Sequence, residues 1–324
     1  MVKKLPFCIA LLAIVITLSD VKNALAQDPQ FTQFYANPLY LNPAFAGTSR
    51  CPRFIMNYRN QWPGLTGTYV TYAASYDQQV DALGGGIGVS TFHDRAGEGT
   101  LNTTNASLMY SYDRPINRHF SVRAALQATF FQKSIDWNRL TFGGMIDARY
   151  GFIYQTNETP ITNSKSGVDF SAGILGFSKK FYGGFAAHHL TEPDESLIPG
   201  GTAKLPRKYT AHAGAIIPLN RDIEESSISP NILFMMQQNF VQVNMGIYVT
   251  KGSVVGGLWY RNRDAFIILL GFTQGMFKIG YSYDVTISKL GVGNTLGSHE
   301  LSLALQFACR PKKRKFRTIS CPSF

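Results

Sequence analysis

Runs of about ten residues, in which apolar and polar side chains alternate, cover most of this 324-residue sequence. In FSVRAALQATF (residues 120–130), every second residue from Phe120 to Phe130 is apolar, and Arg123 and Gln127 lie between them. A repeat of two residues is that of a β-strand, whose side chains point alternately to the two faces of a sheet. The pattern therefore predicts an all-β fold.

We predict fourteen such strands between residues 51 and 308. Their expected ranges are 52–61, 67–77, 84–93, 101–112, 119–131, 167–177, 181–190, 208–218, 227–237, 240–250, 253–260, 264–273, 276–286 and 298–308. Runs of this length match tilted strands that cross a bilayer, which need about 9 to 11 residues, whereas most strands of globular proteins have about 5 or 6. An even number of strands is typical of single-chain bacterial barrels and leaves both chain ends on one side.

The lengths of the connections also favour a membrane barrel over a soluble sandwich. If the first strand rises from the periplasm, the longest connections, at 132–166, 191–207 and 287–297, all face the outside. Most periplasmic connections are short, which is typical of outer-membrane barrels, although a tight turn at Gln238 and Asn239 falls on the outer side. The expected fold is a transmembrane antiparallel β-barrel of about 14 strands with an N-terminal periplasmic or plug-like segment.

The first 26 residues predict a signal peptide for export. Lys3 and Lys4 precede an apolar run, and Ala24-Leu25-Ala26 supplies small residues for cleavage before Gln27. No later apolar run approaches the 20 or so residues of a membrane-spanning helix. We therefore expect an integral outer-membrane protein of a Gram-negative bacterium, with both termini in the periplasm.

Positive charge is concentrated at the C-terminus. Without the signal peptide the net charge falls from +11 to +9, and six of the positive residues lie in 309–324, which contains no acid. This distribution argues against a nucleic-acid-binding protein, whose basic residues spread over a structured face. The tail is either a solvated basic stretch or a contact for an acidic partner or the cell wall on the periplasmic side; its charges include Lys312, Lys313, Arg314, Lys315 and Arg317.

Residues 27–50 contain Asn-Pro twice among aromatic residues and do not read as a barrel strand. Proline cannot donate a hydrogen bond to a sheet, and Asn-Pro favours turns. A barrel of fourteen strands is wide enough to admit a peptide. We therefore expect residues 27–50 to fold into the periplasmic mouth as a partial plug; the residues assigned to it are Phe31, Phe34, Tyr35, Asn37, Pro38, Tyr40, Asn42, Pro43 and Phe45.

Three cysteines remain after signal cleavage. Closure of the barrel would bring Cys51, before the first strand, near Cys309, after the last, so a disulfide could join the seam. A bond between Cys309 and Cys321 within the tail is the alternative.

The histidines do not predict a metal site. His188 and His189 are adjacent in an expected strand, so their side chains should point to opposite faces, and no third ligand joins one of them with His212 at a suitable spacing. A barrel hydrolase that uses one of these histidines has no motif to support it. We expect neither a cofactor nor catalysis.

Five segments resemble the PorP/SprF family of outer-membrane proteins. They are QDPQFTQFYANPLYLNPAFAGT (27–48), NYRNQWPG (57–64), SYDQ (75–78), DWNRLTFGGMID (136–147) and SHELSLALQF (298–307), and the terminal KRKFRTISCPSF is similar to the SprF-like branch associated with gliding motility. The resemblance covers nearly the whole mature chain. It implies a component of the type IX secretion system that assists secretion or surface attachment of a large adhesin with a C-terminal sorting domain. It also implies contact with the periplasmic lipoprotein ring of that system.

The partner would meet the outer connections of the barrel, because loops carry binding surfaces on a rigid frame. The residues predicted to contact it are Tyr58, Arg59, Asn60, Gln61 and Trp62 at the top of the first strand, with Trp137, Asn138, Arg139 and Phe142 in the longest connection. Outer-membrane lipid is the other expected partner. The alternative function is transport of a small or hydrophobic solute, gated by the N-terminal segment.

Overall fold

The computed structural model describes residues 28–49, 51–97, 99–147, 149–155, 163–219, 226–288 and 292–308. Most of these residues belong to long strands. The strands of the main sheet are β1 (Arg53–Gln61), β2 (Tyr69–Val80), β3 (Gly85–Ala96), β4 (Leu101–Pro115), β5 (Ser121–Ile135), β8 (Ser164–Phe177), β9 (Phe181–His188), β10 (Lys208–Ala215), β11 (Ile217–Pro218), β12 (Ser226–Gln237), β13 (Phe240–Lys251), β14 (Val254–Arg261), β15 (Ala265–Gln274), β16 (Phe277–Thr286) and β17 (Ser298–Gln306).

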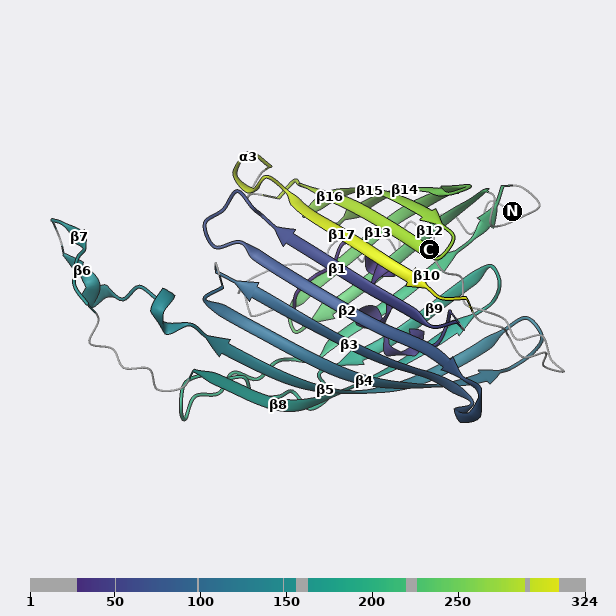
Figure 1. Cartoon of the computed structure of the whole chain (residues 1–324), viewed down its shortest axis with the longest axis horizontal. Coiled ribbons are helices and arrows are strands. Elements are labelled where there is room, and N and C mark those ends of the chain that lie inside the picture. The colour runs from purple at the N-terminus through teal and green to yellow at the C-terminus, as the bar shows by residue number, and fades with distance from the viewer. Residues whose placement is uncertain are drawn as a thin grey trace, which may run out of the picture.

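These strands form one antiparallel sheet that closes on itself (Figure 1). Consecutive strands pair in chain order, and the first strand, β1, pairs with the last, β17, from Arg53 opposite Gln306 to Gln61 opposite Ser298. The two-residue β11 continues β10 along β12, so the described residues form a barrel of fourteen strands. The predicted fourteen-stranded antiparallel barrel is confirmed.

The remaining elements are short. Three helical turns precede the barrel, η1 (Phe34–Ala36), α2 (Pro38–Leu41) and η2 (Pro43–Phe45). Connections contain η3 (Asp81–Leu83), η4 (Trp137–Arg139), η5 (Gly143–Met145) and α3 (Val292–Thr295), and β6 (Ile146–Asp147) pairs with β7 (Gly151–Phe152) in a separate hairpin. Among the described residues, no helix has the length and apolar character needed to cross a membrane.

The barrel is polar inside and apolar outside. In β5, Arg123 and Thr129 are buried on the inner face, whereas Leu126 is 69% and Phe130 51% exposed on the outer face. The same contrast holds around the sheet, where buried Glu300 faces inward on β17. Side chains that face lipid are apolar and those that line the interior can be polar, so this arrangement is that of a transmembrane barrel.

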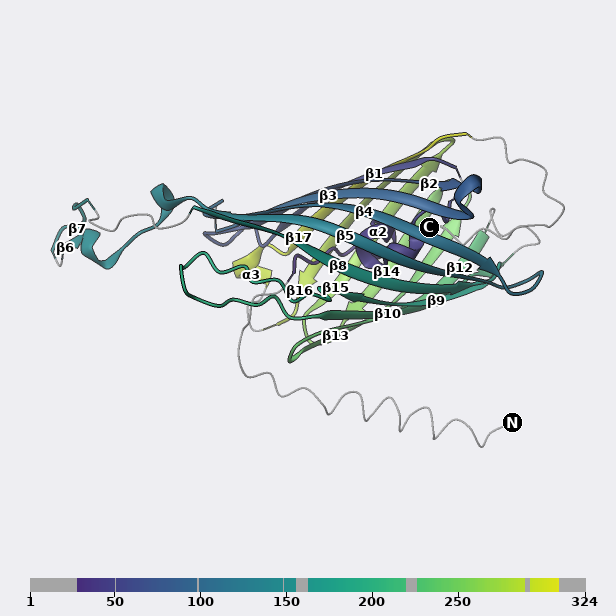
Figure 2. The same ribbon diagram turned by 90° about the horizontal axis from the view of Figure 1, so that it is seen from below.

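The two ends of the barrel differ in their connections. At one end, which we call the loop end, lie the long connections 62–68, 136–163, 189–207 and 287–297. At the other, the turn end, lie short ones such as 178–180, 252–253 and 275–276. The connection between β5 and β8 carries η4, β6 and β7 away from the rest of the molecule (Figures 1 and 2).

Residues 28–49, which we call the luminal segment, run through the barrel from the loop end to the turn end. Asp28 contacts Lys208, the first residue of β10, at the loop end, whereas the Gly47 N–H bonds to Asp77 near the turn end. Figure 2 shows α2 enclosed by the strands. The expectation for residues 27–50 is a partial plug in the periplasmic mouth, and the described part of this range extends further, through the barrel to the opposite end.

The described ends of the chain therefore lie at opposite ends of the barrel. The Phe307 N–H donates to the Pro52 carbonyl at 2.9 Å, which places it at the turn end, while Asp28 lies at the loop end. The even strand count leads to the expectation that both ends share one side. The difference arises because the luminal segment crosses the barrel once before β1 begins.

Candidate functional site

The two Asn-Pro pairs begin two helical turns of the luminal segment. Pro38 and Pro43 occupy the first positions of α2 and η2, where a missing N–H needs no partner. The Asn42 side chain caps η2 by accepting a hydrogen bond from the Ala44 N–H at 2.9 Å. These turns satisfy part of the backbone locally, which a strand without a neighbour could not do.

The luminal segment is buried by the barrel wall. The exposed fractions of Phe31, Phe34, Tyr35 and Phe45 are 3, 5, 7 and 4%. Of the other residues assigned to the plug, Tyr40 is half-buried, and the buried ones are Asn37, Pro38, Asn42 and Pro43. All nine therefore lie within the barrel.

Aromatic side chains of the wall surround η1. The ring of Phe34 meets that of Trp259 at 5.3 Å, and the ring of Tyr35 meets that of Tyr182 at 5.6 Å, both edge to face. Tyr248 and Trp259 also pack together, with ring centroids 5.5 Å apart. Such pairs add about 0.5–1.5 kcal/mol each to the effect of burial, so η1 is held by its side chains.

Asn42 fits into a notch between β8 and β9. Its amide nitrogen donates to the carbonyl oxygens of Ile174 and Phe185, at 3.1 and 3.3 Å. Two glycines make room for it, because a Cβ on Gly173 would lie 2.1 Å from Asn42 Oδ1 and one on Gly184 would lie 2.9 Å from Asn42 Nδ2. The notch fixes the middle of the luminal segment against the wall.

Wall side chains also bind the backbone of the luminal segment. Glu300 accepts the N–H groups of Thr32 and Gln33 at 2.6 and 3.2 Å. Further along, Thr210 donates to the Leu41 carbonyl at 3.1 Å, and Arg123 donates to the Ala46 carbonyl at 2.7 Å. A coiled segment needs such partners, because its buried polar groups have no sheet ladder.

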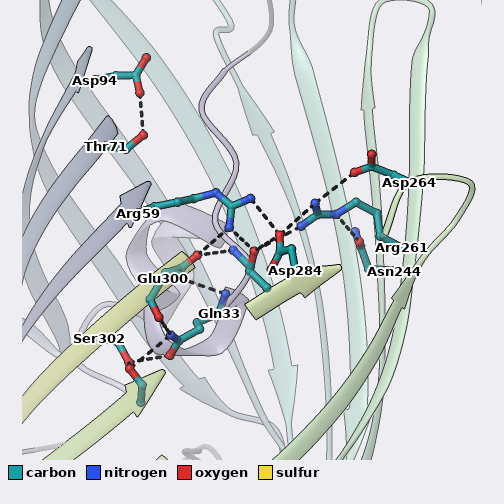
Figure 3. A network of polar contacts seen from close by, with 12 residues as sticks. Gln33, Arg59, Thr71, Asp94, Asn244, Arg261, Asp264, Asp284, Glu300 and Ser302 are labelled. Atoms are coloured by element: carbon teal, nitrogen blue, oxygen red, sulfur yellow. Dashed lines mark hydrogen bonds and ion pairs between the residues drawn. The ribbon is translucent and has the colours of Figure 1, made fainter. Parts of the chain in front are cut away.

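Charged residues on β1, β14, β16 and β17 form a network that contacts Thr32. Figure 3 shows its members Arg59, Arg261, Asp284 and Glu300. Arg59 Nη2 lies 2.9 Å from Asp284 Oδ2, and Arg59 Nη1 lies 3.3 Å from Glu300 Oε2. Arg261 Nη1 lies 3.4 Å from Asp284 Oδ2, and the Thr32 hydroxyl donates to the same oxygen at 2.7 Å. The luminal segment thus completes an ionic network that joins the first and last strands.

A second charged cluster, which we call the latch, holds Asp28. Lys208 Nζ donates to Asp28 Oδ2 at 2.6 Å, and His189 Nε2 lies 2.9 Å from the same oxygen. The other ring nitrogen of His189 lies 2.8 Å from Asp169 Oδ2, and Thr191 donates to Asp169 Oδ1 at 2.6 Å. His189 therefore bridges the start of the luminal segment to β8.

The latch is charged at neutral pH. Burial alone would raise the pKa of Asp28, but His189 and Lys208 outweigh it and hold this pKa well below its usual value. Burial would lower the pKa of His189, but Asp28 and Asp169 outweigh it and raise the pKa to about 9. His189 is thus protonated and pairs with a carboxylate on each side.

The expectation that His188 and His189 point to opposite faces is wrong. β9 ends at His188, and His189 has a positive φ of 58°, so strict alternation stops between them. Their rings lie 6.4 Å apart, and His189 turns toward the luminal segment. The sequence carries no local signal for this turn. Within the described residues, no three metal-binding side chains gather at His188, His189, His212 or elsewhere.

The first group of residues predicted to contact a partner divides between the two faces of β1. Arg59 is 1% exposed and points into the barrel, so it cannot contact a partner that binds the outer connections. Tyr58 faces outward and packs on Tyr72 at 5.2 Å, as in an aromatic girdle at a membrane interface. Asn60, Gln61 and Trp62 reach the loop end.

The second group lies in the connection between β5 and β8. Trp137, Asn138 and Arg139 form η4, and the rings of Trp137 and Phe142 stack at 5.9 Å. Strands β2, β3 and β4 separate this connection from β1 in the sheet, so the two groups lie at different places of the loop end.

The predicted cysteine pairs and the basic tail fall largely beyond the described part of the chain. Cys51 is disulfide-bonded. Cys309 and Cys321 lie outside the described residues, as do Lys312, Lys313, Arg314, Lys315 and Arg317. The partner of Cys51 and the role of the tail stay predictions.

Comparison with known proteins identifies a family for most of the chain. Residues 23–305 match the family described as type IX secretion system membrane protein PorP/SprF. A search of curated proteins found no match. Solved structures similar to the chain include the outer membrane protein Omp33 of Acinetobacter baumannii (9% identity, 80% of this chain, 100% of that chain, TM-score 0.44). A FadL homologue of Pseudomonas aeruginosa is also similar, with 12% identity over 88% of this chain and 100% of that chain and a TM-score of 0.46. The toluene transporter TodX of P. putida has 9% identity over 83% of this chain and 93% of that chain, and its TM-score is also 0.46.

Proposed function

Because the chain belongs to the PorP/SprF family of type IX secretion system membrane proteins, we propose that this outer-membrane barrel holds a secreted surface protein at the cell surface. The proposed cargo is a large adhesin of the gliding-motility type with a type IX C-terminal sorting domain, as the resemblance of the sequence implies. The role is one of binding and needs no catalysis. One observation carries the proposal: an aromatic connection projects from the loop end of a barrel whose lumen is occupied.

The occupied lumen favours docking over passage. The luminal segment spans both ends of the barrel and is fixed by the Asn42 notch and by the network around Thr32. A folded or extended cargo would have to displace all of these contacts. Cargo that docks on the loop end would displace none of them.

The connection between β5 and β8 has the composition of a binding surface. Its hairpin exposes Tyr150 (68%), Phe152 (64%) and Ile153 (54%), and Trp137 stacks on Phe142 nearer the barrel. Exposed aromatic residues that project from a rigid frame are typical of protein-binding surfaces. We propose that Trp137, Asn138, Arg139 and Phe142 contact the cargo, with Asn60, Gln61 and Trp62 at the rim.

On the other side of the membrane, we propose that the basic tail meets the periplasmic lipoprotein ring. This proposal rests on the sequence, in which residues 309–324 carry six positive charges and no acid. It requires the turn end to face the periplasm, which is consistent with the short connections found there.

A strain in which the chain carries Trp137→Ala and Phe142→Ala tests the docking proposal. Peptides shaved from intact cells would be quantified by mass spectrometry and compared with proteins in the medium. We expect a large surface protein to move from the cells to the medium while the barrel keeps its normal amount in the outer membrane. Ile116→Ala, an exposed residue of the turn end, is the matched control.

An unchanged surface proteome in the double variant would contradict docking on this connection. Complete deletion of the gene distinguishes the alternative function. Loss of small-solute uptake with a normal surface proteome would support the transport barrel instead.

A further inference from the structure

Two cavities lie on opposite sides of η1 inside the barrel. The upper cavity, of about 40 Å³ near the loop end, is lined by residues that include Asp28, Phe31, Phe34, Tyr40, Lys208 and Gln237. The lower cavity, of about 80 Å³ toward the turn end, is lined by residues that include Gln33, Tyr35, Ala36, Arg53, Lys278 and Ser302. One turn of chain, residues 33–36, therefore separates two spaces that are each large enough for water.

The luminal segment is held differently on the two sides of this turn. From Asn37 onward it continues into β1, and the Asn42 notch and the bonds to the Ala46 carbonyl and the Gly47 N–H fix it to the wall. Residues 28–36, which we call the gate segment, precede all of these attachments. Their polar contacts with the wall are the latch at Asp28 and the bonds around Thr32 and Gln33.

We propose that the gate segment opens when the latch at Asp28 releases and the bonds of Thr32 and Gln33 to the wall then break, and that its movement joins the two cavities into a narrow path for water and small anions. The movement pivots near Asn37, because the chain beyond that residue keeps its contacts with β8, β9 and β10. Tyr35 and Phe34 leave the aromatic cluster around Trp259 as the turn moves.

The charges along the path select for anions. Lys208 lines the upper cavity, and Arg53 and Lys278 line the lower one. Arg53 pairs with Asp77 at 2.9 Å, which reduces its contribution to the positive charge of the lower cavity. Among the described residues that line the two cavities, the sole acid is Asp28, which leaves with the gate segment.

Asp28→Asn in the full-length protein tests the gate, because it keeps the shape of the side chain and removes the charge that binds His189 and Lys208. Removing one member of a buried charge pair leaves the other charge buried without compensation, so the closed position of the gate segment should be strongly destabilised. In planar lipid bilayers we expect the fraction of time that the protein conducts to rise at least about tenfold over wild type. The reversal potential in a KCl gradient should show preference for chloride, and Lys278→Gln added to Asp28→Asn should reduce that preference.

Hydrogen exchange gives a second readout that does not depend on conduction. The N–H groups of Thr32 and Gln33 donate to Glu300, so they are protected while the gate segment is closed. In Asp28→Asn, peptides that cover residues 28–36 should exchange at least about tenfold faster, and peptides that cover residues 41–47 should be unchanged. Lys208→Met removes the partner that Asp28 has on β10, so it should also speed the exchange of residues 28–36.

Asp147→Asn, in the hairpin of β6 and β7, is the matched control and should resemble wild type in both measurements. Equal conduction and equal exchange in Asp28→Asn and wild type would overturn the proposal. Faster exchange along the whole of residues 28–49 would also overturn it, because the luminal segment would then leave as one unit. These results do not depend on the surface proteome, so the gate and the docking proposal can fail separately.

Discussion

Replacing His189 by glutamine should remove a pH dependence of stability that the latch gives to the wild type. His189 is enclosed by Asp28, Asp169 and Lys208, with the ring of His188 beside it. Its pKa is raised from 6.5 to about 9 in the folded protein. The folded state therefore binds the proton more tightly than the unfolded state does. The stabilisation is fully present below pH 6.5 and is lost as the pH rises through 9.

The size of the effect follows from the pKa difference. One pKa unit corresponds to about 1.36 kcal/mol, so the difference between 6.5 and about 9 corresponds to about 3 kcal/mol. The side chain of His189 is 13% exposed, so solvent screens this interaction only in part. The free energy of unfolding of the wild type should fall by up to about 3 kcal/mol between pH 6 and pH 10 through this residue.

Urea unfolding in lipid vesicles, followed by tryptophan fluorescence at several pH values, measures this slope. His189→Gln should be less stable than wild type at pH 6 and should approach it above pH 9. His93→Gln is the control, because His93 lies on the outer face of β3 and bonds to Thr104. If His189→Gln keeps the wild-type slope, the imidazolium does not hold the latch and the reasoning is refuted.

Two further substitutions test the interior. Arg59→Leu leaves two acids of the network without one of their cations and should lower the free energy of unfolding by about 3–5 kcal/mol, whereas Arg139→Leu, whose side chain is 50% exposed, should change it by less than about 0.5 kcal/mol. Gly173→Ala places a Cβ 2.1 Å from Asn42 Oδ1 and should cost about 1–3 kcal/mol, whereas Gly256→Ala meets no atom within 4 Å. Equal losses in either pair, measured by the same urea assay, would contradict the packing described here.

The strands could be predicted because their signal is local. In β5, Arg123 lies on one face and Leu126 and Phe130 lie on the other, which shows directly which face meets lipid. Each of the fourteen predicted ranges overlaps an observed strand. The same alternation applies in β1, where the neighbours Tyr58 and Arg59 must face opposite sides of the sheet. With the apolar side chains facing lipid, it predicts that Arg59 points into the barrel. The position of Arg59 near the end of the predicted strand suggests the rim, but the alternation of side chains along the strand is the stronger argument.

The interior depends on contacts that no local pattern reveals. Asp28 and His189 are 161 residues apart, and Thr32 and Glu300 are 268 residues apart, so the latch and the ionic network exist only in the closed barrel. The aromatic Asn-Pro segment indicated a coil that could enter the lumen. Its route to the loop end depends on two features of the wall, the notch between β8 and β9 that binds Asn42 and the carboxylate of Glu300. Neither feature can be inferred from the sequence of the luminal segment alone.

Thr32 touches both edges of the sheet at once, through Arg59 on β1 and Glu300 on β17. The pairing of these two strands and the contacts of Thr32 therefore depend on one another in the folded barrel. A change that displaces Thr32 removes contacts to the first and the last strand together, so occupation of the lumen is coupled to closure of the sheet.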